Sequence, residues 1–406
     1  MPKALLKKII VSASVLFCIG PGLVQATDTP LAARLKAVAG GSPTMVKVVY
    51  TKLETRDALD FPTDTWKTNE FLMGIRSDVG VEETLQTTKS NYQNPLITHD
   101  GQHVVYTTIT AGVGTTFMVD WTRNSTPRTI AGGMTSCLWF DTATGKEYAI
   151  CAKNCGLSGS SFSRIDLSDT TNSAVMFTVG SPAVTQWIRV SADGKAYSGC
   201  LGPFSSGDME VRYCSDNSPI GMMSGGCWAS MPYDNSYRFV RTTGDHDKWQ
   251  IMGPGMTTPL ELLDGVLFFT SLFSQDRMAS YIPNLFLLVD NAVNSDEGTG
   301  DIYIVRTDSS LQHIQDTATV TSGANSHFAD IWASSVPGTG VKLKPTRVAP
   351  TPKSGPVEYY SISGRRVFVA ANEKSGRIFG RLSTGVYITV GGAGNRATVR
   401  IVSAVK

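Results

Sequence analysis

The most concentrated chemistry in this sequence is a short polar run, Gly244-Asp245-His246-Asp247, in which two carboxylates flank one imidazole. Side chains of these types can coordinate a cation or contact a polar substrate, and an ordinary polar turn is the alternative. The chain has five histidines, at positions 99, 103, 246, 313 and 327. It contains neither a Gly-x-Ser-x-Gly nucleophile elbow nor a His-Glu-x-x-His zinc pair. The sequence therefore assigns no catalytic residue and no cofactor, and it leaves metal binding unknown.

Aromatic side chains are a second source of ligand contacts. We expect Trp139, Trp187, Trp228 and Trp332 near the upper ends of strands that line a central channel. Indole rings in that position can stack on sugar faces or grip a peptide, and the first three are ligand-binding candidates together with Asp245, His246 and Asp247. Packing between neighbouring sheets is the alternative, and it is the more common role of buried tryptophan.

Cysteines are structural rather than catalytic candidates. The chain has seven, and setting aside Cys18 in the N-terminal leader leaves six, clustered in the middle of the sequence. An even number in an exported chain favours disulfides, with free buried thiols as the alternative. The spacing about a hairpin turn predicts that Cys137 and Cys151 lie opposite each other and form a disulfide. Cys155 competes for the same partner.

Residues 1–26 have the parts of a secretory signal peptide. Lysines at positions 3, 7 and 8 precede an apolar run, Ile9–Val24, and Ala26 stands where a signal peptidase would cleave. No later stretch is long and apolar enough to span a bilayer. The sequence thus predicts an exported protein, secreted or at the cell surface, with the periplasm as the alternative and with no membrane span once the signal is removed.

The charge pattern argues against a nucleic-acid partner. The net charge is +2 and charged residues make up 17% of the chain. A nucleic-acid binder needs a basic patch or stripe that neutralises phosphates, and the sequence has none.

Residues 27–334 consist of repeated hairpin units. Short apolar runs recur in six units of comparable length, with turn pairs at Asp100-Gly101, Thr144-Gly145, Asp193-Gly194 and Asp234-Asn235. Four antiparallel strands per unit, repeated every 40–50 residues or so, are typical of β-propeller blades. The first unit lacks its leading strand, and the late segment His327–Trp332 can supply it. We therefore predict an all-β, six-bladed propeller closed by this strand, with a brief helix at Leu31–Val38.

Three segments resemble the TolB-like propeller repeat. They are Pro95–Tyr106, with its Asp-Gly turn and following apolar strand, Val190–Tyr197 and Met231–Tyr237. The resemblance extends over about residues 45–333. It implies binding to a protein or a small ligand, and it transfers no catalytic residue.

The C-terminal segment is organised differently. Residues 335–356 are rich in proline and read as an extended linker, and residues 357–406 form a small β-sandwich-like module. The motifs Gly364-Arg365-Arg366 and Gly385-Val386-Tyr387, followed by a basic β-run, resemble the C-terminal sorting domain of type IX secretion. That resemblance implies the export machinery as a partner, and a β-module without a sorting role is the alternative.

Together these features predict a secreted or cell-surface β-propeller that binds a protein, peptide or glycan at its loop face without catalysis. A cell-surface glycosidase or lyase on the same scaffold is the alternative, and a purely structural surface-layer component is a third. An enzyme of this kind would need two carboxyl groups facing one pocket. The fold alone does not decide among these functions.

Overall fold

The structure is a computed structural model, and it describes two compact units separately, Met1–Gly340 and Val341–Lys406. The described residues are 29–40, 43–54, 69–153, 158–201, 208–243, 249–262, 273–290, 300–323, 326–334, 357–361, 366–370, 385–391 and 398–404. The predicted leader and linker lie outside these ranges. None of the described helices is long and apolar enough to cross a membrane.

The brief helix expected near the N-terminus is present as α1 (Pro30–Ala39). The Thr29 hydroxyl accepts a hydrogen bond from the Ala32 amide at 3.2 Å, and proline occupies the first helical position. Both features favour a helix start, because the first amides have no partner within the helix. Leu35 and Val38 face the protein core.

The first blade is completed by a strand from the far end of the unit. Its strand order is β24 (Ser326–Ala333), β1 (Val46–Leu53), β2 (Glu70–Arg76) and β3 (Glu82–Ser90). β24 runs antiparallel to β1, with Val48 opposite Ile331 and Thr51 opposite His327. This confirms the predicted closure, which leaves β1 without an open edge.

The second blade consists of β4 (Gln93–Ile97), β5 (His103–Thr110), β6 (Val113–Asp120) and β7 (Arg128–Gly132). The third and fourth blades belong to one continuous sheet. The third consists of β8 (Met134–Asp141), β9 (Lys146–Ala152), β10 (Ser158–Asp166) and β11 (Ser173–Val184). The fourth consists of β12 (Arg189–Val190), β13 (Ala196–Leu201), β14 (Asp208–Tyr213) and β15 (Pro219–Met223), and it follows the short 3-10 helix η1 (Thr185–Trp187). A single residue pair, Ala183 with Leu201, joins these two halves.

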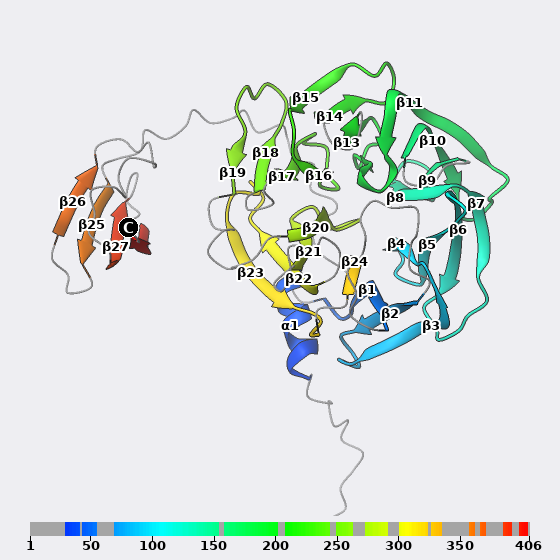
Figure 1. The fold of residues 1–406 in the computed structure, drawn as a ribbon, viewed down its shortest axis with the longest axis horizontal. Helices are drawn as coiled ribbons and strands as arrows, with labels where there is room; N and C mark the ends of the chain where they lie inside the picture. Colours follow the sequence, from blue (N-terminus) through cyan, green and yellow to red (C-terminus); the bar gives the residue numbers. More distant parts are fainter. Residues whose placement is uncertain are drawn as a thin grey trace, which may run out of the picture. The chain divides into compact units, whose positions relative to one another are not determined.

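The last two blades are again separate sheets. The fifth consists of β16 (Cys227–Ser230), β17 (Phe239–Thr242), β18 (Trp249–Met252) and β19 (Leu260–Glu261). The sixth consists of β20 (Phe273–Met278), β21 (Leu285–Asp290), β22 (Asp301–Thr307) and β23 (Ile314–Thr319). Figure 1 shows the sheets set radially, with β4, β20 and β24 near the centre and β3, β7, β19 and β23 at the rim. The unit is a β-propeller.

The apolar core is divided in a way that agrees with the predicted six blades. The buried hydrophobic residues form six clusters, and each lies between two neighbouring sheets, including one between the sixth blade and the first. In the cluster between the first and second blades, for example, Leu72 and Leu85 meet Ile97 and Val104. When the joined sheet is counted as two blades, the six clusters correspond to six blade interfaces.

The register of the third blade corrects the predicted disulfide. A β-bulge between Thr135 and Cys137 shifts the pairing, so that Cys137 lies opposite Ile150 and Cys151 lies opposite Thr135. The two side chains also face opposite sides of the sheet, because Cys137 packs towards the fourth blade and Cys151 towards the second. Both are buried free thiols.

The second unit contains one antiparallel sheet in its described part. Its strand order is β26 (Arg366–Ala370), β25 (Val357–Ser361), β27 (Gly385–Gly391) and β28 (Thr398–Ala404). The longest pairing joins β27 and β28, from Gly385 opposite Ala404 to Gly391 opposite Thr398.

Candidate functional site

The two ends of the propeller ring are built differently. At the turn end, the first strand of each blade turns into the second, as at 98–102 in the second blade and 142–145 in the third. At the opposite loop end, the second strand connects to the third and each blade connects to the next. Asp245, His246 and Asp247 fall between β17 and β18, outside the described residues, so the structure describes only the strand ends beside them.

Other predicted site residues are also only partly described. Trp228 lies in β16, but its side chain is outside the described part. Gly364 and Arg365 precede β26, which starts at Arg366, and are not described. Gly385, Val386 and Tyr387 are the first three residues of β27.

The structure places Trp139 and Trp187 between blades. Trp139 is 5% exposed and packs in the cluster between the third and fourth blades, while Trp187 is 3% exposed and packs between the fourth and fifth. The Trp139 ring is stacked on Tyr148, with their centroids 5.4 Å apart. These positions correspond to the packing alternative that the sequence left open, and they leave little of either ring for a ligand.

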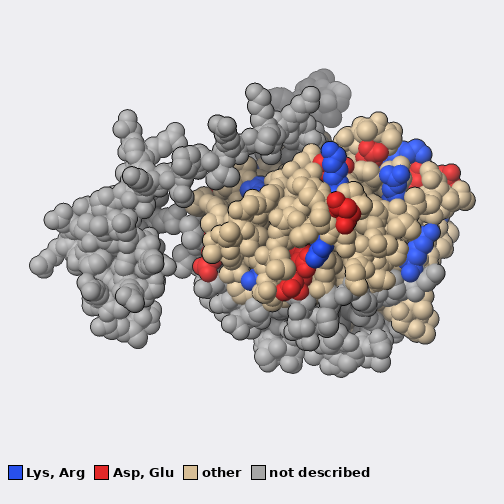
Figure 2. Space-filling model, turned by 90° about the horizontal axis from the view of Figure 1, so that it is seen from above, with Lys and Arg blue, Asp and Glu red and all other residues tan. Residues whose placement is uncertain are grey.

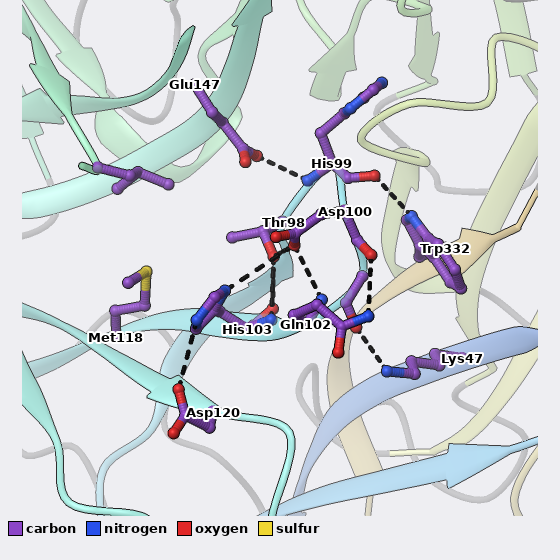
Figure 3. A network of polar contacts seen from close by, with 12 residues as sticks. Lys47, Thr98, His99, Asp100, Gln102, His103, Met118, Asp120, Glu147 and Trp332 are labelled. Carbon is purple, nitrogen blue, oxygen red and sulfur yellow. Dashed lines mark hydrogen bonds and ion pairs between the residues drawn. The ribbon is translucent and has the colours of Figure 1, made fainter.

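Trp139 and Trp332 also lie at the turn end of the ring. The sequence predicts them at the upper ends of the strands, around the channel mouth at the loop end, so this prediction is wrong. Trp332 Nε1 donates to the His99 carbonyl at 2.8 Å, and Trp139 Nε1 donates to the Ala192 carbonyl at 3.1 Å. Each tryptophan thus binds the first-to-second-strand turn of the next blade (Figure 3 shows the Trp332 contact). The repeated contact fixes neighbouring blades to each other.

Side chains from four blades meet across the ring axis at the turn end. Glu147 of the third blade accepts hydrogen bonds from the His99 amide at 2.8 Å and from the Tyr281 hydroxyl of the sixth blade. His99 is stacked on Phe140, with centroids 3.9 Å apart. Tyr233 of the fifth blade donates to the Phe140 carbonyl at 2.8 Å and contacts Tyr281 edge-on. We call these five residues the turn-end cluster. Because the third and sixth blades are opposite in the ring, this cluster spans the ring axis at the turn end.

Burial changes the protonation of the turn-end cluster. It raises the pKa of Glu147 to about 7, against the opposing effect of the hydrogen bonds from Tyr281 and His99. It also lowers the pKa of His99, with Asp100 acting in the opposite sense. Both shifts follow from the cost of placing a charge away from water. Near neutral pH the cluster therefore contains a neutral imidazole and a carboxyl group close to its titration midpoint.

A more exposed polar network surrounds this cluster (Figure 3). His103 lies 3.3 Å from Asp120 and 3.8 Å from Asp100. Lys47 donates to the Gly101 carbonyl at 2.5 Å and lies 4.9 Å from the centre of the Trp121 ring. Burial is the main reason why the pKa of Lys47 is lowered. These groups stabilise the turn of the second blade, and no group of three or more His, Cys, Asp or Glu residues within the described ranges could hold a metal ion.

Deeper in the ring, Asp330 of β24 links three blades. Its carboxylate accepts from the Ile97 amide at 2.9 Å, from the Ser280 amide at 3.0 Å and from the Ser280 hydroxyl at 2.7 Å. Asp330 is fully buried. Buried carboxylates persist when hydrogen bonds replace the lost water, and here the donors come from both neighbours of the closing strand.

Two arginines lie at the same depth. Arg277 of β20 donates to the carbonyls of Ala329 and Pro95 and to the Asn94 side chain. Arg189 of β12 donates to the Ser136 carbonyl of the third blade. No motif in the sequence marks Asp330, Arg189 or Arg277, although a charged residue within an apolar inner strand is a recognisable signal.

Nearer the loop end, a histidine and a glutamate are buried together. His327 Nε2 lies 3.4 Å from Glu70 Oε1, and both side chains are fully buried. Burial raises the pKa of Glu70, and the nearby His327 partly opposes this shift. The pair joins β24 to β2 beneath the point where β1 and β2 are connected.

Comparisons with known proteins give structural neighbours only. No family model matches the chain, and no curated protein matches it. A crystal structure of TolB from Acinetobacter baumannii is similar at 14% identity, covering 70% of this chain and 66% of that one, with a TM-score of 0.46. The chain thus spans just under two thirds of that TolB. The chain resembles other propellers in fold.

Two further neighbours have different functions. Hydrazine synthase of Kuenenia stuttgartiensis is 12% identical over 78% of this chain and 50% of that one, with a TM-score of 0.48. A nidogen/laminin complex is 9% identical over 70% of this chain and 98% of that one, with a TM-score of 0.46. Likenesses at this level give no function, and the fold assignment rests on the sheets and clusters described above.

The surface shows no extended region of one charge on the face drawn in Figure 2. Basic and acidic groups alternate over its described part and are separated by uncharged surface. Binding to nucleic acid depends on a continuous basic region, and the described part of this face has none.

Proposed function

We propose that the protein is a secreted or cell-surface propeller that binds a protein, peptide or glycan at its loop end without catalysing a reaction. The observation that supports this most directly is the turn-end cluster. Because Glu147 and Tyr281 meet across the axis, we expect a ligand that enters the ring to approach from the loop end. Connecting segments at such an end are the usual place for binding residues.

The length of the connections supports the same end. Those between β1 and β2 (54–69) and between β21 and β22 (291–300) are longer than the first-to-second-strand turns 98–102 and 142–145, whereas the β5–β6 connection (111–112) is short. Long connections on a rigid scaffold can vary in sequence without cost to the core. Asp245, His246 and Asp247 belong to a connection at this end and remain our candidates for ligand contact.

The enzymatic alternative has less support. Glycoside hydrolysis by two carboxyl groups requires both to face one pocket. Glu147 has the raised pKa of a general acid, but Tyr281 and the His99 amide occupy its oxygen. Within the described residues, the buried carboxylate of Asp330 accepts hydrogen bonds from Ile97 and Ser280, and the buried carboxyl of Glu70 lies 3.4 Å from His327.

The proposal also includes export. The order of the Gly-Arg-Arg and Gly-Val-Tyr motifs, with Arg366 at the start of β26 and Gly385–Tyr387 at the start of β27, supports a sorting role for residues 341–406. A basic leader and an apolar run at the N-terminus support secretion through the inner membrane.

Two arrays test the binding proposal, one of glycans and one of purified envelope proteins. We expect the mature protein to retain one class of component. The triple variant Asp245→Asn, His246→Gln, Asp247→Asn should lose it, and the turn-end variant His103→Gln, Asp120→Asn should keep it. Retention of no component, together with release of new reducing or unsaturated sugar ends from any glycan, would replace the binding proposal with the enzymatic one.

A further inference from the structure

The interior of the ring contains more positive than negative charge at the depth of Asp330. The negative charge of Asp330 raises the pKa of both Arg189 and Arg277, and the positive charge of Arg189 lowers the pKa of Arg277. Cys137, the other group that acts on Arg189, does not balance the charge, because burial raises the pKa of its thiol to about 11 and keeps it neutral. Among the described residues, one carboxylate therefore faces two guanidinium groups.

Hydrogen bonding leaves donors of this region unused. Arg189 is 5% exposed, and within the described part of the chain its Nε has no oxygen or nitrogen acceptor, while the Cys137 thiol beside its guanidinium is a weak acceptor. The buried hydroxyl of Ser136 also lacks a partner there, although the Ser136 carbonyl accepts from both Arg189 and Asn94. Buried donors without acceptors are costly in native proteins, so an acceptor bound at this place would be favourable.

Arg277 remains within reach of solvent. It lies deep in the ring and burial lowers its pKa to about 9, with repulsion from Arg189 as the next cause. Even so, its side chain is only partly buried. At neutral pH it stays protonated.

We propose that Arg189 and Arg277, with the Ser136 hydroxyl, form a binding site inside the ring for an oxyanion group such as a phosphate, sulfate or carboxylate. Guanidinium groups bind these oxyanions through short, charge-assisted hydrogen bonds. A monoanion at this depth would balance the surplus charge and supply acceptors for the unused donors. The turn-end cluster spans the ring axis at one end, so we expect the anion to enter from the loop end. The site does not depend on the proposed function, since a structural propeller could contain it as well.

Equilibrium dialysis of the full mature protein against labelled phosphate, sulfate or acetate tests the site, with the ionic strength held constant with sodium chloride. We expect one anion per chain for at least one of the three probes, and the order of affinities distinguishes a phosphate-type from a carboxylate-type ligand. The same probe should raise the thermal unfolding midpoint, because it binds the folded state.

Two substitutions locate the site. Arg277→Gln and Arg189→Gln should each weaken binding by at least about tenfold, since each removes a charged donor. Arg238→Gln is the matched control, because Arg238 also donates to two carbonyls, those of Ser309 and Ser310, but belongs to a turn-end segment outside this charge cluster. Full retention of binding in both channel variants would overturn the proposal. So would the absence of one-site binding in the wild-type protein, which decides the question even if the variants do not fold.

Discussion

Glu147 of the third blade is held by donors from the neighbouring second blade and the opposite sixth blade. Its carboxyl accepts from the His99 amide and from the Tyr281 hydroxyl, and Tyr281 is itself 4% exposed. Burial raises its pKa to about 7 from an ordinary value of 4.5. A raised pKa in the folded state means that folding favours the protonated carboxyl, so the benefit is complete below the unfolded pKa and is lost as the pH rises through 7.

Substituting Glu147→Gln should therefore stabilise the propeller at alkaline pH. A glutamine oxygen can accept both hydrogen bonds and never becomes charged. Between pH 5 and pH 8 the wild-type free energy of unfolding should fall by roughly 2–3 kcal/mol relative to the variant. Urea unfolding at several pH values, followed by tryptophan fluorescence, measures this difference.

Comparing the wild type with Glu147→Gln cancels the contribution of the other titrating groups to the pH dependence of stability. His99, whose pKa is lowered by burial, acts in the opposite direction, because its charging destabilises the fold as the pH falls. It is present in both proteins and cancels in the difference. Parallel stability curves for the wild type and Glu147→Gln would show that Glu147 titrates normally.

At the scale of the strand and turn, substitutions at two glycines can separate the cost of a positive φ from the cost of a steric clash. Gly101 and Gly145 both lie in first-to-second-strand turns, with φ of 71° and 68°. A Cβ added to Gly101 would lie 2.5 Å from the Trp332 ring, whereas one added to Gly145 would meet nothing within 4 Å. The indole cannot easily move away, because its Nε1 is bonded to the His99 carbonyl.

Gly101→Ala should consequently destabilise the propeller more than Gly145→Ala. The positive φ costs about 1 kcal/mol at either position, and the clash with the ring adds roughly 1–3 kcal/mol at Gly101 alone. Chemical unfolding of both variants measures the difference. Equal destabilisation would mean that Trp332 does not hold the turn of the second blade.

The sequence predicted these elements well where the signal was local. Asp-Gly turns followed by apolar strands identified the hairpins, and the surplus strand around Trp332 identified the closure. The bulge at Ser136 was not predictable, because an extra residue in a strand leaves no mark in its hydrophobic pattern. That one residue shifts Cys137 away from Cys151, and with it the predicted disulfide fails.

For the whole molecule, the repeat predicted the ring, but the groups inside it could not be assembled from the sequence. Asp330, Arg277 and Arg189 come from the first, sixth and fourth blades, and only ring closure brings them near each other. The same holds for Glu147 and Tyr281, which are separated by 134 positions along the chain. Turn signals fix the strands, whereas side-chain contacts across the axis depend on the exact register of each blade.

Two truncations test closure and the role of the second unit. A chain ending at residue 340 keeps β24 and should unfold with the same urea midpoint as the full-length protein, because the contacts of the propeller lie within the first unit. A chain ending at residue 325 lacks β24, which exposes the edge of β1 and removes Asp330 and Trp332 from their partners. It should lose its cooperative transition.

The same pair of chains separates stability from export when both keep the leader. If residues 341–406 direct surface delivery, the chain ending at 340 should fold normally and yet accumulate in the periplasm of a bacterium that has type IX secretion. Cell fractionation with an antibody against the propeller measures its location. Normal surface display of this chain would contradict the sorting role, while an unchanged urea midpoint for the chain ending at 325 would contradict ring closure by β24. The two outcomes are independent, since one concerns the second unit and the other the last strand of the first.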